Sequence, residues 1–380
     1  MSGRLESVRR LLRRAVSDAS HVATRGRDHF ERVEDTPMRV TVSGVRGKST
    51  VVRWLNEALV DRGFETYAKV TGNHAVSYRN LEERPIERDG TVRLYENEGE
   101  LRRHAPVDAV VAENQGIREY TTRLANELFD PHVVIVLNVR RDHQSTLGAT
   151  LPDIARVFSR TIPENAHVVS GDRNEAVNGY LRRELSKTGN GLTVADPPAD
   201  SPFADVFGAR SAFVVDETLR QLGLDPLSPG QIEAYVEGLR SEWQWRRLRG
   251  GGLVANGASM NDIESTELLR QFLVDRLDGP TVTPFVYTRR DRAGRTVAFV
   301  HYLNWLAGND LVGRVHVAGN HADLLERRVD AEVVNHAERN DARAALDDAL
   351  ADGYPVYAVG NTVAEFMRAF ADEIERRAVE

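Results

Sequence analysis

The chain has 380 residues, a net charge of −7, 41% hydrophobic residues and no cysteine. This length exceeds one compact core, so two or three domains are expected. The negative charge argues against general nucleic-acid binding, and the lack of cysteine excludes disulfides and thiolate metal sites. The longest apolar run, Val133–Leu137, is too short for a membrane span, and no signal peptide is recognisable, so the expected compartment is the cytoplasm.

Residues 1–36 are set apart as a basic amphipathic segment that predicts a helix. One helical face carries Leu5, Val8, Leu12, Ala15 and Ala19, with Arg9, Arg10, Arg13 and Arg14 beside them. Two interpretations stay open. The helix docks on a membrane surface or a partner, or it packs on the main body with a solvated basic face.

A glycine-bounded turn follows the first predicted strand, in the stretch RVTVSGVRGKST. The turn consists of Gly44, Val45, Arg46 and Gly47. Its glycines let the backbone approach a phosphate, and the helix that follows offers unpaired N–H groups and a positive dipole end. Lys48 adds a cation, and Ser49 or Thr50 can supply a hydroxyl to Mg²⁺. The turn therefore predicts a nucleoside triphosphate site; the alternative is an ordinary glycine-rich turn with a chance lysine.

Strands alternate with helices from Pro37 onward, which predicts a parallel sheet covered on both faces. The predicted strands are Arg39–Ser43, Phe64–Val70, Val107–Glu113, His132–Asn138 and His167–Ser170. The predicted helices are Ser49–Arg62, Ile117–Leu128, Leu151–Ser159 and Pro229–Leu239. The charged stretch Tyr78–Leu94 is expected to form a hairpin or loop, and Leu185–Ser211 a sheet edge or loop.

A second α/β pattern starts near Gly252 and predicts a smaller Rossmann-like unit. Its strands are expected at Leu253–Asn256, Thr281–Tyr287, Arg314–Ala318 and Val356–Val359. Its helices are expected at Ser265–Leu277, Arg295–Leu306, Ala344–Ala351 and Thr362–Arg377. We therefore predict an α/β protein with a larger domain over residues 37–255 and a smaller one over residues 256–380.

Polar residues directly after the strands are the candidate site residues, because open α/β sheets bind ligands beyond the carboxyl ends of their strands. Glu113 ends an apolar strand, where an acid is costly unless it is paired or metal-bound. Asn138 and His143 follow another strand, and Lys69 and Thr71 a third. These tips are expected to converge on one triphosphate with Mg²⁺. The alternatives are a helix N-terminal carboxylate for Glu113 and a hydrogen-bonded loop histidine for His143.

Six motifs carry a resemblance to a known family. SGVRGKST, AKVTGN, VVAENQ and NVRRDHQSTLG resemble the central domain of Mur-type ATP-dependent amide ligases, and NGASMNDIEST and YTRRDRAGRT resemble the poly-γ-glutamate synthase ligase subunit, the CapB/PgsB-like branch. The resemblance covers roughly Pro37 to Asn361. It implies a P-loop ATPase domain with a mostly parallel sheet, followed by a Rossmann-like domain that closes over the site, with ATP and Mg²⁺ as cofactors.

The resemblance also implies roles for the candidates in the first domain. Lys48 and the backbone of the turn would hold the β- and γ-phosphates. Ser49 or Thr50 would hold one Mg²⁺ together with Glu113. His143 would hold a second Mg²⁺ or orient the γ-phosphate.

Further roles are implied at the substrate site and in the second domain. Lys69 and Thr71 would line the site. Arg246 or Arg247 would touch the nucleotide, and Asn261 and Asp262 would lie at the hinge, where an acid reaches the ribose. The arginines that would bind a carboxylate of the incoming amino acid are Arg289, Arg290, Arg292 and Arg295. The alternative for each arginine is a solvated loop paired with Asp291.

The implied reaction forms an amide bond. A carboxylate attacks the γ-phosphate to give an acyl phosphate and ADP, and the amine of an amino acid, glutamate by resemblance, then displaces phosphate. The implied partners are that amino acid and a carboxylate acceptor. A membrane-embedded partner subunit, a peripheral position at the inner face of the membrane and a homo-oligomer are left open.

Two departures from the family limit what the resemblance implies. Only about 36 residues precede the ATPase domain, so a UDP-linked substrate is not expected. No lysine lies between Lys69 and Lys187 to serve as the carbamoylated lysine of many members, which leaves a second metal without that ligand.

Three other functions stay open at this point. The first is a ligase that adds a single amino acid to a small acceptor. The second is a P-loop NTPase that acts as a switch or accessory. The third is a nucleotide-binding scaffold for a membrane-embedded partner.

Overall fold

A computed structural model describes residues 26–72, 75–88, 93–141, 144–198, 200–260, 262–338 and 340–379. The chain divides into two compact units, which are described separately. Unit 1 runs to Asp196 and also takes Ser211–Ser228, and unit 2 comprises Pro197–Arg210 and the chain from Pro229 onward. The predicted N-terminal amphipathic face falls within residues 1–25, outside the described residues, whereas residues 26–34 are helical.

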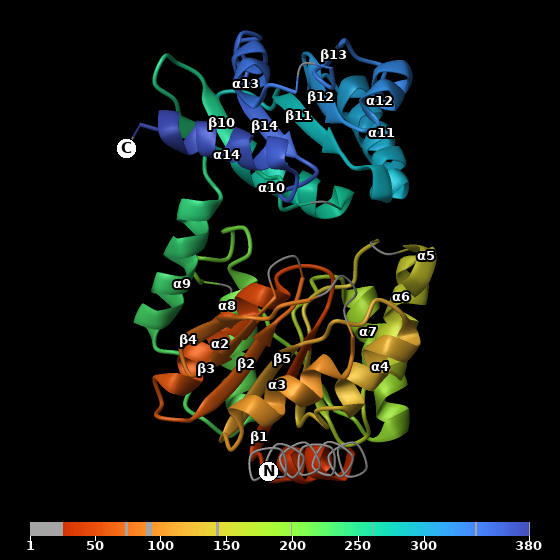
Figure 1. Ribbon diagram of the computed structural model, residues 1–380, viewed down its shortest axis with the longest axis vertical. Coiled ribbons are helices and arrows are strands. Elements are labelled where there is room, and N and C mark those ends of the chain that lie inside the picture. Colours follow the sequence, from red (N-terminus) through yellow and green to blue (C-terminus); the bar gives the residue numbers. More distant parts are fainter. Residues whose placement is uncertain are drawn as a thin grey trace, which may run out of the picture. The chain divides into compact units, whose positions relative to one another are not determined.

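Unit 1 is built on an eight-stranded sheet in the order β4-β3-β2-β5-β1-β6-β7-β8 (Figure 1). The strands are β1 (Met38–Ser43), β2 (Thr66–Val70), β3 (Val76–Arg79), β4 (Glu82–Pro85), β5 (Ala109–Glu113), β6 (Val133–Val136), β7 (His167–Ser170) and β8 (Leu192–Val194). β3 and β4 form an antiparallel hairpin at one edge, and the other six strands are parallel. The central strands are apolar along their length because a covered parallel sheet is buried on both faces.

Helices cover this sheet and connect its strands. They are α2 (Lys48–Val60), α3 (Glu96–His104), α4 (Glu119–Glu127), α5 (Gln144–Leu147), α6 (Leu151–Arg160), α7 (Glu175–Leu185) and α8 (Arg210–Gln221). Leu101 of α3 packs in one buried cluster with Tyr67 of β2 and Val110 of β5. Residues of α6 and α7 form a second cluster with β6 and β7. These clusters fix the strands whose carboxyl ends carry the candidate site.

Unit 2 is built on a six-stranded sheet in the order β13-β12-β11-β14-β10-β9. The strands are β9 (Arg246–Arg247), β10 (Leu253–Asn256), β11 (Thr283–Thr288), β12 (Val315–Gly319), β13 (Val333–Asn335) and β14 (Val356–Val359). The helices are α9 (Pro229–Glu242), α10 (Ile263–Val274), α11 (Ala293–Gly308), α12 (Ala322–Arg328), α13 (Ala342–Leu350) and α14 (Glu365–Arg377). Only β9 runs antiparallel to its neighbour among these described strands.

The core of unit 2 centres on Phe285 of β11, which is fully buried. Its ring stacks on Phe370 of α14 with a centroid distance of 4.4 Å, and α13 packs beside α14 in the same cluster. α10 and α11 contact each other and contribute nothing to this cluster. The helices that follow the adjacent strands β11 and β14 therefore lie in different layers, an arrangement that opens a crevice at the carboxyl ends of the strands.

The predicted α/β class with mostly parallel sheets is confirmed, and Tyr78–Leu94 contains the expected hairpin. Five helices, α3, α5, α7, α8 and α12, and the edge strands β9 and β13 were not predicted. The predicted domain boundary between residues 255 and 256 differs from the structure, because it falls inside β10. Pairing of β9 with β10 places the chain before this boundary in unit 2, which takes up at Pro229. Within the described residues, every helix is too short or too polar to cross a bilayer.

Gly360, directly after β14, tests the close packing at the strand ends of unit 2. Its φ is +107°, and an added Cβ would lie 2.5 Å from the carbonyl oxygen of Tyr287. Gly360→Ala is therefore expected to lower the free energy of unfolding by about 1–3 kcal/mol. Urea unfolding measures the change, with Gly279→Ala as the control, since nothing lies within 4 Å of a Cβ there. Equal stability of the two variants would contradict the prediction.

Candidate functional site

The turn between β1 and α2 is shaped to receive an anion. Gly44 has a φ of +122°, and an added Cβ would lie 3.0 Å from the backbone nitrogen of Asn138. Gly47 has a φ of +80° at the N-cap of α2, and its cap position makes no side-chain hydrogen bond. No side chain therefore caps the backbone N–H groups in the first turn of α2, which contains Ser49 and Thr50, and such a helix start suits an anion.

Asn138, which lies just beyond β6, fixes the shape of this turn. Its Oδ1 accepts hydrogen bonds from the backbone N–H of Val45 at 3.0 Å and of Arg46 at 2.9 Å. Its Nδ2 donates to the carbonyl oxygen of Arg46 at 3.0 Å. The described hydrogen bonds of the Asn138 side chain, which was predicted to contact the cofactor, are therefore made with the backbone of the turn.

Glu113 joins three strand tips. Its carboxylate is nearly buried and accepts hydrogen bonds from the Ser49 hydroxyl at 2.9 Å and from the Thr71 backbone N–H at 3.0 Å. The Nζ of Lys48 lies 3.7 Å from its other oxygen and donates to the carbonyl oxygen of Gly44 at 3.0 Å. The structure thus brings together the cation, the hydroxyl and the acid that the sequence placed after β1 and β5.

These groups fit a hard divalent cation such as Mg²⁺, which prefers carboxylate and hydroxyl oxygens. Ser49 and Glu113 offer one oxygen of each kind within hydrogen-bond distance of each other. Among the described residues, no group of three or more His, Asp or Glu side chains could form a metal cage. A magnesium ion here would therefore keep water ligands and take others from a bound phosphate. His143, the other predicted metal ligand, lies outside the described residues.

The prediction that Lys69 lines the substrate site needs correction, because its side chain is completely buried. Its Nζ lies 2.7 Å from the Glu96 carboxylate, donates to Gln115 Oε1 at 2.9 Å and also donates to the Asn97 side chain. Burial lowers the pKa of this ammonium, and the hydrogen bond and charge of Glu96 oppose that shift. Lys69 therefore contributes to a buried ionic network behind the site.

Arg88 and Glu96 extend this network to the site, and the sequence did not reveal either. The Nε and Nη2 of Arg88 each donate to a Glu96 oxygen at 2.8 Å. The same guanidinium donates to Thr71 Oγ1 at 3.1 Å and to the carbonyl oxygen of Gly72 at 3.3 Å. The signal that existed was Lys69 itself, because a lysine in an apolar strand requires an acidic partner, but its spacing does not identify which acid.

The predicted nucleotide contacts Arg246 and Arg247, which the sequence placed before the last domain, and the hinge residue Asp262 all lie in unit 2. Arg246 is half-buried and Arg247 exposed, both on β9. Asp262 is buried and caps α10, accepting a hydrogen bond from the backbone N–H of Ser265 at 2.9 Å. Asn261 lies outside the described residues, so the hinge and ribose roles stay predictions.

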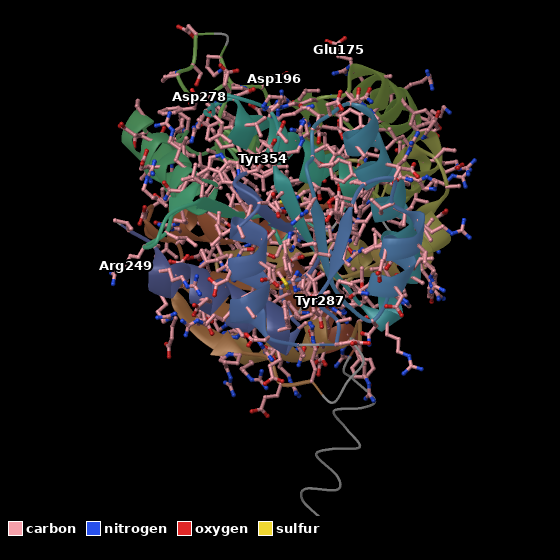
Figure 2. The ribbon with its side chains drawn as sticks, turned by 90° about the horizontal axis from the view of Figure 1, so that it is seen from above. Glu175, Asp196, Arg249, Asp278, Tyr287 and Tyr354 are labelled. Carbon is pink, nitrogen blue, oxygen red and sulfur yellow. The ribbon has the colours of Figure 1, made fainter. Side chains whose placement is uncertain are left out.

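A cavity of about 420 Å³ lies at the carboxyl ends of the unit 2 strands. It is lined by Tyr287, Arg289, Arg290, Asp291, Asn320, Val363 and Ala364, with Tyr287 labelled in Figure 2. The Nε and Nη2 of Arg289 both donate to the Asp291 carboxylate at 2.8 Å. Arg292 and Arg295 line a smaller cavity beside it. Two of the four predicted arginines therefore face the larger cavity, and one is already paired with an acid.

Sequence comparisons find similarity to bacterial proteins named CapB. Residues 245–377 match the family described as poly-gamma-glutamate synthase CapB C-terminal domain. The chain is 26% identical over 314 residues to PGA synthase CapB of Bacillus subtilis (strain 168), covering 75% of this chain and 76% of that protein. It is 32% identical over 300 residues to capsule biosynthesis protein CapB of Bacillus anthracis, covering 72% of this chain and 62% of that protein.

Three solved structures share the fold. FolC of E. coli in complex with ADP has a TM-score of 0.64 at 16% identity, covering 93% of this chain and 92% of that chain. A bifunctional folylpolyglutamate synthase/dihydrofolate synthase with Mn, AMPPNP and L-glutamate bound has a TM-score of 0.59 at 16% identity and covers 92% of both chains. MurF from Acinetobacter baumannii has a TM-score of 0.62 at 15% identity, covering 93% of this chain and 80% of that chain.

Asn138→Ala tests the hydrogen bonds that hold the turn. The substitution leaves the N–H groups of Val45 and Arg46 without their side-chain acceptor, so the free energy of unfolding is expected to fall by about 2 kcal/mol. Urea unfolding measures this change. The control is Gln221→Ala on the exposed side of α8, where less than about 0.5 kcal/mol is expected. A stability of Asn138→Ala equal to that of wild type would show that the turn holds its shape without this side chain.

Proposed function

We propose that this chain is an ATP-dependent, ADP-forming amide ligase of the Mur ligase superfamily, because residues 245–377 match the CapB C-terminal domain family, two CapB proteins are similar to it in sequence, and it shares its fold with MurF. The bond that it forms joins a carboxylate acceptor to the amine of an amino acid. Glutamate is the proposed amino acid, with poly-γ-glutamate-type synthesis as the process. The observation that carries this proposal is the carboxylate of Glu113, held between Ser49 and Thr71 beside the ammonium of Lys48.

The cofactors of the proposed reaction are ATP and a divalent cation, Mg²⁺ in the first place. The related structures that contain ADP, or AMPPNP with Mn, support both. In this chain the uncapped start of α2 and Lys48 would hold the phosphates, and Ser49 and Glu113 would hold the ion. A bound cation supplies charge neutralisation at the γ-phosphate.

The residues of unit 1 act by position and charge. The carboxylate of the acceptor attacks the γ-phosphate, the bond to the β-phosphate oxygen breaks, and ADP leaves with that electron pair. Lys48 lies at the turn that would hold those phosphates, where an ammonium stabilises the charge that develops on the transferred group. Asn138 keeps the turn in shape by accepting from the N–H groups of Val45 and Arg46, so the phosphates would be held by the N–H groups at the start of α2.

Unit 2 would supply the pocket for the incoming amino acid. The cavity beyond β11 presents the guanidinium groups of Arg289 and Arg290, which suit a carboxylate. The free amine of the amino acid then attacks the acyl phosphate, an amide forms, and inorganic phosphate leaves. Exclusion of water matters at this step, because water would hydrolyse the same intermediate.

The remaining partners implied by the family stay predictions. They are a membrane-embedded subunit and a second copy of the chain. A cytoplasmic location at the inner face of the membrane is likewise a prediction, and a fractionation experiment on cells that express the full chain addresses it.

Lys48→Ala is expected to lower the rate of ADP formation at least about a hundredfold, because the charge on the transferring phosphoryl group loses its ammonium partner. The measurement is release of ADP and phosphate from Mg·ATP in the presence of glutamate and a glutamyl acceptor. Circular dichroism and thermal unfolding verify that the variant is folded. Lys187→Ala is the matched control, since that lysine is exposed in the short 3-10 turn that follows α7 and pairs only with Glu184 among the contacts described.

The products separate this proposal from its alternatives. AMP and pyrophosphate, or ADP formation that no acceptor and no amino acid stimulates, would overturn the ligase assignment. Mass spectrometry of the reaction then distinguishes two kinds of ligase. A ladder of products spaced by one glutamyl residue is expected for polymer synthesis, whereas a single product indicates one addition to a small acceptor.

A further inference from the structure

Three charged side chains lie together behind the candidate site, and none of them reaches solvent freely. Lys69 is completely buried, and the side chains of Arg88 and Glu96 are 12% and 14% exposed. Glu96 accepts from both cations, at 2.7 Å from Lys69 and at 2.8 Å from Arg88. Removing charges from water is costly even when they are paired and hydrogen-bonded. Stability alone therefore does not explain this group, and a role in positioning neighbouring residues does.

The network ends at the segment that follows β2. Arg88 donates to the hydroxyl of Thr71 at 3.1 Å and to the carbonyl oxygen of Gly72 at 3.3 Å. The backbone N–H of Thr71 in turn donates to Glu113 at 3.0 Å. A continuous path of hydrogen bonds therefore runs from half-buried Glu96, through Arg88 and Thr71, to the Glu113 carboxylate.

A second connection reaches the chain just after Glu113. Lys69 donates to the side chain of Gln115, which lies two residues after Glu113. The amide of Gln115 also donates to the carbonyl oxygen of Arg93 at 3.0 Å. The end of β5 is thus held through the same buried group that holds the segment after β2.

We propose that Arg88 and Glu96 are positioning residues that fix the Thr71 segment, and through it the Glu113 carboxylate, in the orientation that binds a divalent cation with a nucleotide. This inference rests on the proposed function and adds to it two residues that lie outside the phosphate turn. Neither residue touches the reacting atoms. Their effect passes through the Thr71 backbone, so they set the affinity for the cation rather than the chemistry of phosphoryl transfer.

Fixing the Thr71 segment requires the planar guanidinium of Arg88. A guanidinium donates two parallel hydrogen bonds to Glu96 and still has N–H groups for Thr71 and Gly72. Lysine keeps the positive charge, but its single nitrogen cannot make these contacts in fixed directions. Arg88→Lys therefore separates orientation from charge.

The test measures binding of AMPPNP, a nucleotide that is not turned over, by titration calorimetry with Mg²⁺ and with EDTA. In Arg88→Lys, the affinity for Mg·AMPPNP is expected to fall about tenfold, the scale seen when groups that orient a metal ligand are removed. Binding in EDTA is expected to change less than about twofold, because the phosphate turn and Lys48 are untouched. The ratio of the affinity for AMPPNP with Mg²⁺ to its affinity in EDTA is therefore expected to fall.

Two substitutions at Thr71 keep the test decisive if Arg88→Lys folds poorly. Thr71→Val removes the hydroxyl that Arg88 contacts but keeps the side-chain shape and the backbone N–H, so it is expected to reproduce the loss. Thr71→Ser keeps the hydroxyl and is expected to lose less affinity for Mg·AMPPNP than Thr71→Val.

The control for general damage is Arg79→Lys. Arg79 pairs with Glu65 at 2.8 Å and donates to the carbonyl oxygen of Pro106, at the opposite end of β2 from Thr71. This variant is expected to lose thermal stability while its Mg²⁺ dependence stays unchanged.

Each outcome has a defined meaning. An Arg88→Lys protein that keeps the wild-type ratio of these affinities overturns the inference, as does one that loses affinity equally with Mg²⁺ and with EDTA. A wild-type protein that does not bind Mg·AMPPNP overturns the proposed function itself, and the two failures are therefore told apart by the wild-type titration.

Discussion

The structure of unit 1 depends on one nearly buried carboxylate. Glu113 ends β5, and an acid in that position is stable only where donors surround it. The strand order supplies them, because β5 lies between β2 and β1 and its tip is flanked by the Thr71 segment on one side and the phosphate turn on the other. The position of β5 between β2 and β1 therefore supplies the donors that Glu113 needs. In a different order of strands, the carboxylate would lie away from Ser49 and Thr71.

Much of this arrangement was readable from the sequence, because it follows from local patterns. Apolar runs located the central strands to within a few residues, and the rule that ligands bind at strand ends selected Lys48, Glu113 and Asn138. Periodicity worked less well where helices are polar. α3, with the charged sequence ENEGELRRH, was not predicted, although its Leu101 is completely buried in a cluster with strand residues. Tertiary packing, rather than propensity, decides that segment.

The parts that the sequence did not reveal depend on burial and on long-range pairing. Lys69 follows the same pattern as the other strand-end residues, yet it points into the protein, and period alone does not tell which face of β2 is covered by α3. Arg88 and Glu96 come from a loop and a helix start with no motif around them. Their importance is visible only in three dimensions, where they meet a buried lysine and the backbone beside the site.

The hydrogen bonds from Val45 and Arg46 to the Asn138 side chain have a consequence for the synthesis of this chain on the ribosome. The bonded groups lie 92 and 93 positions apart in the chain. A ribosome adds about 5–20 residues per second, so the glycine turn emerges on the order of ten seconds before the amide that will secure it. The nascent β1 has neither of its sheet neighbours until β5 (Ala109–Glu113) is made, and it gains the second only when β6 (Val133–Val136) follows. The turn before α2 therefore acquires its final shape late in the synthesis of this polypeptide.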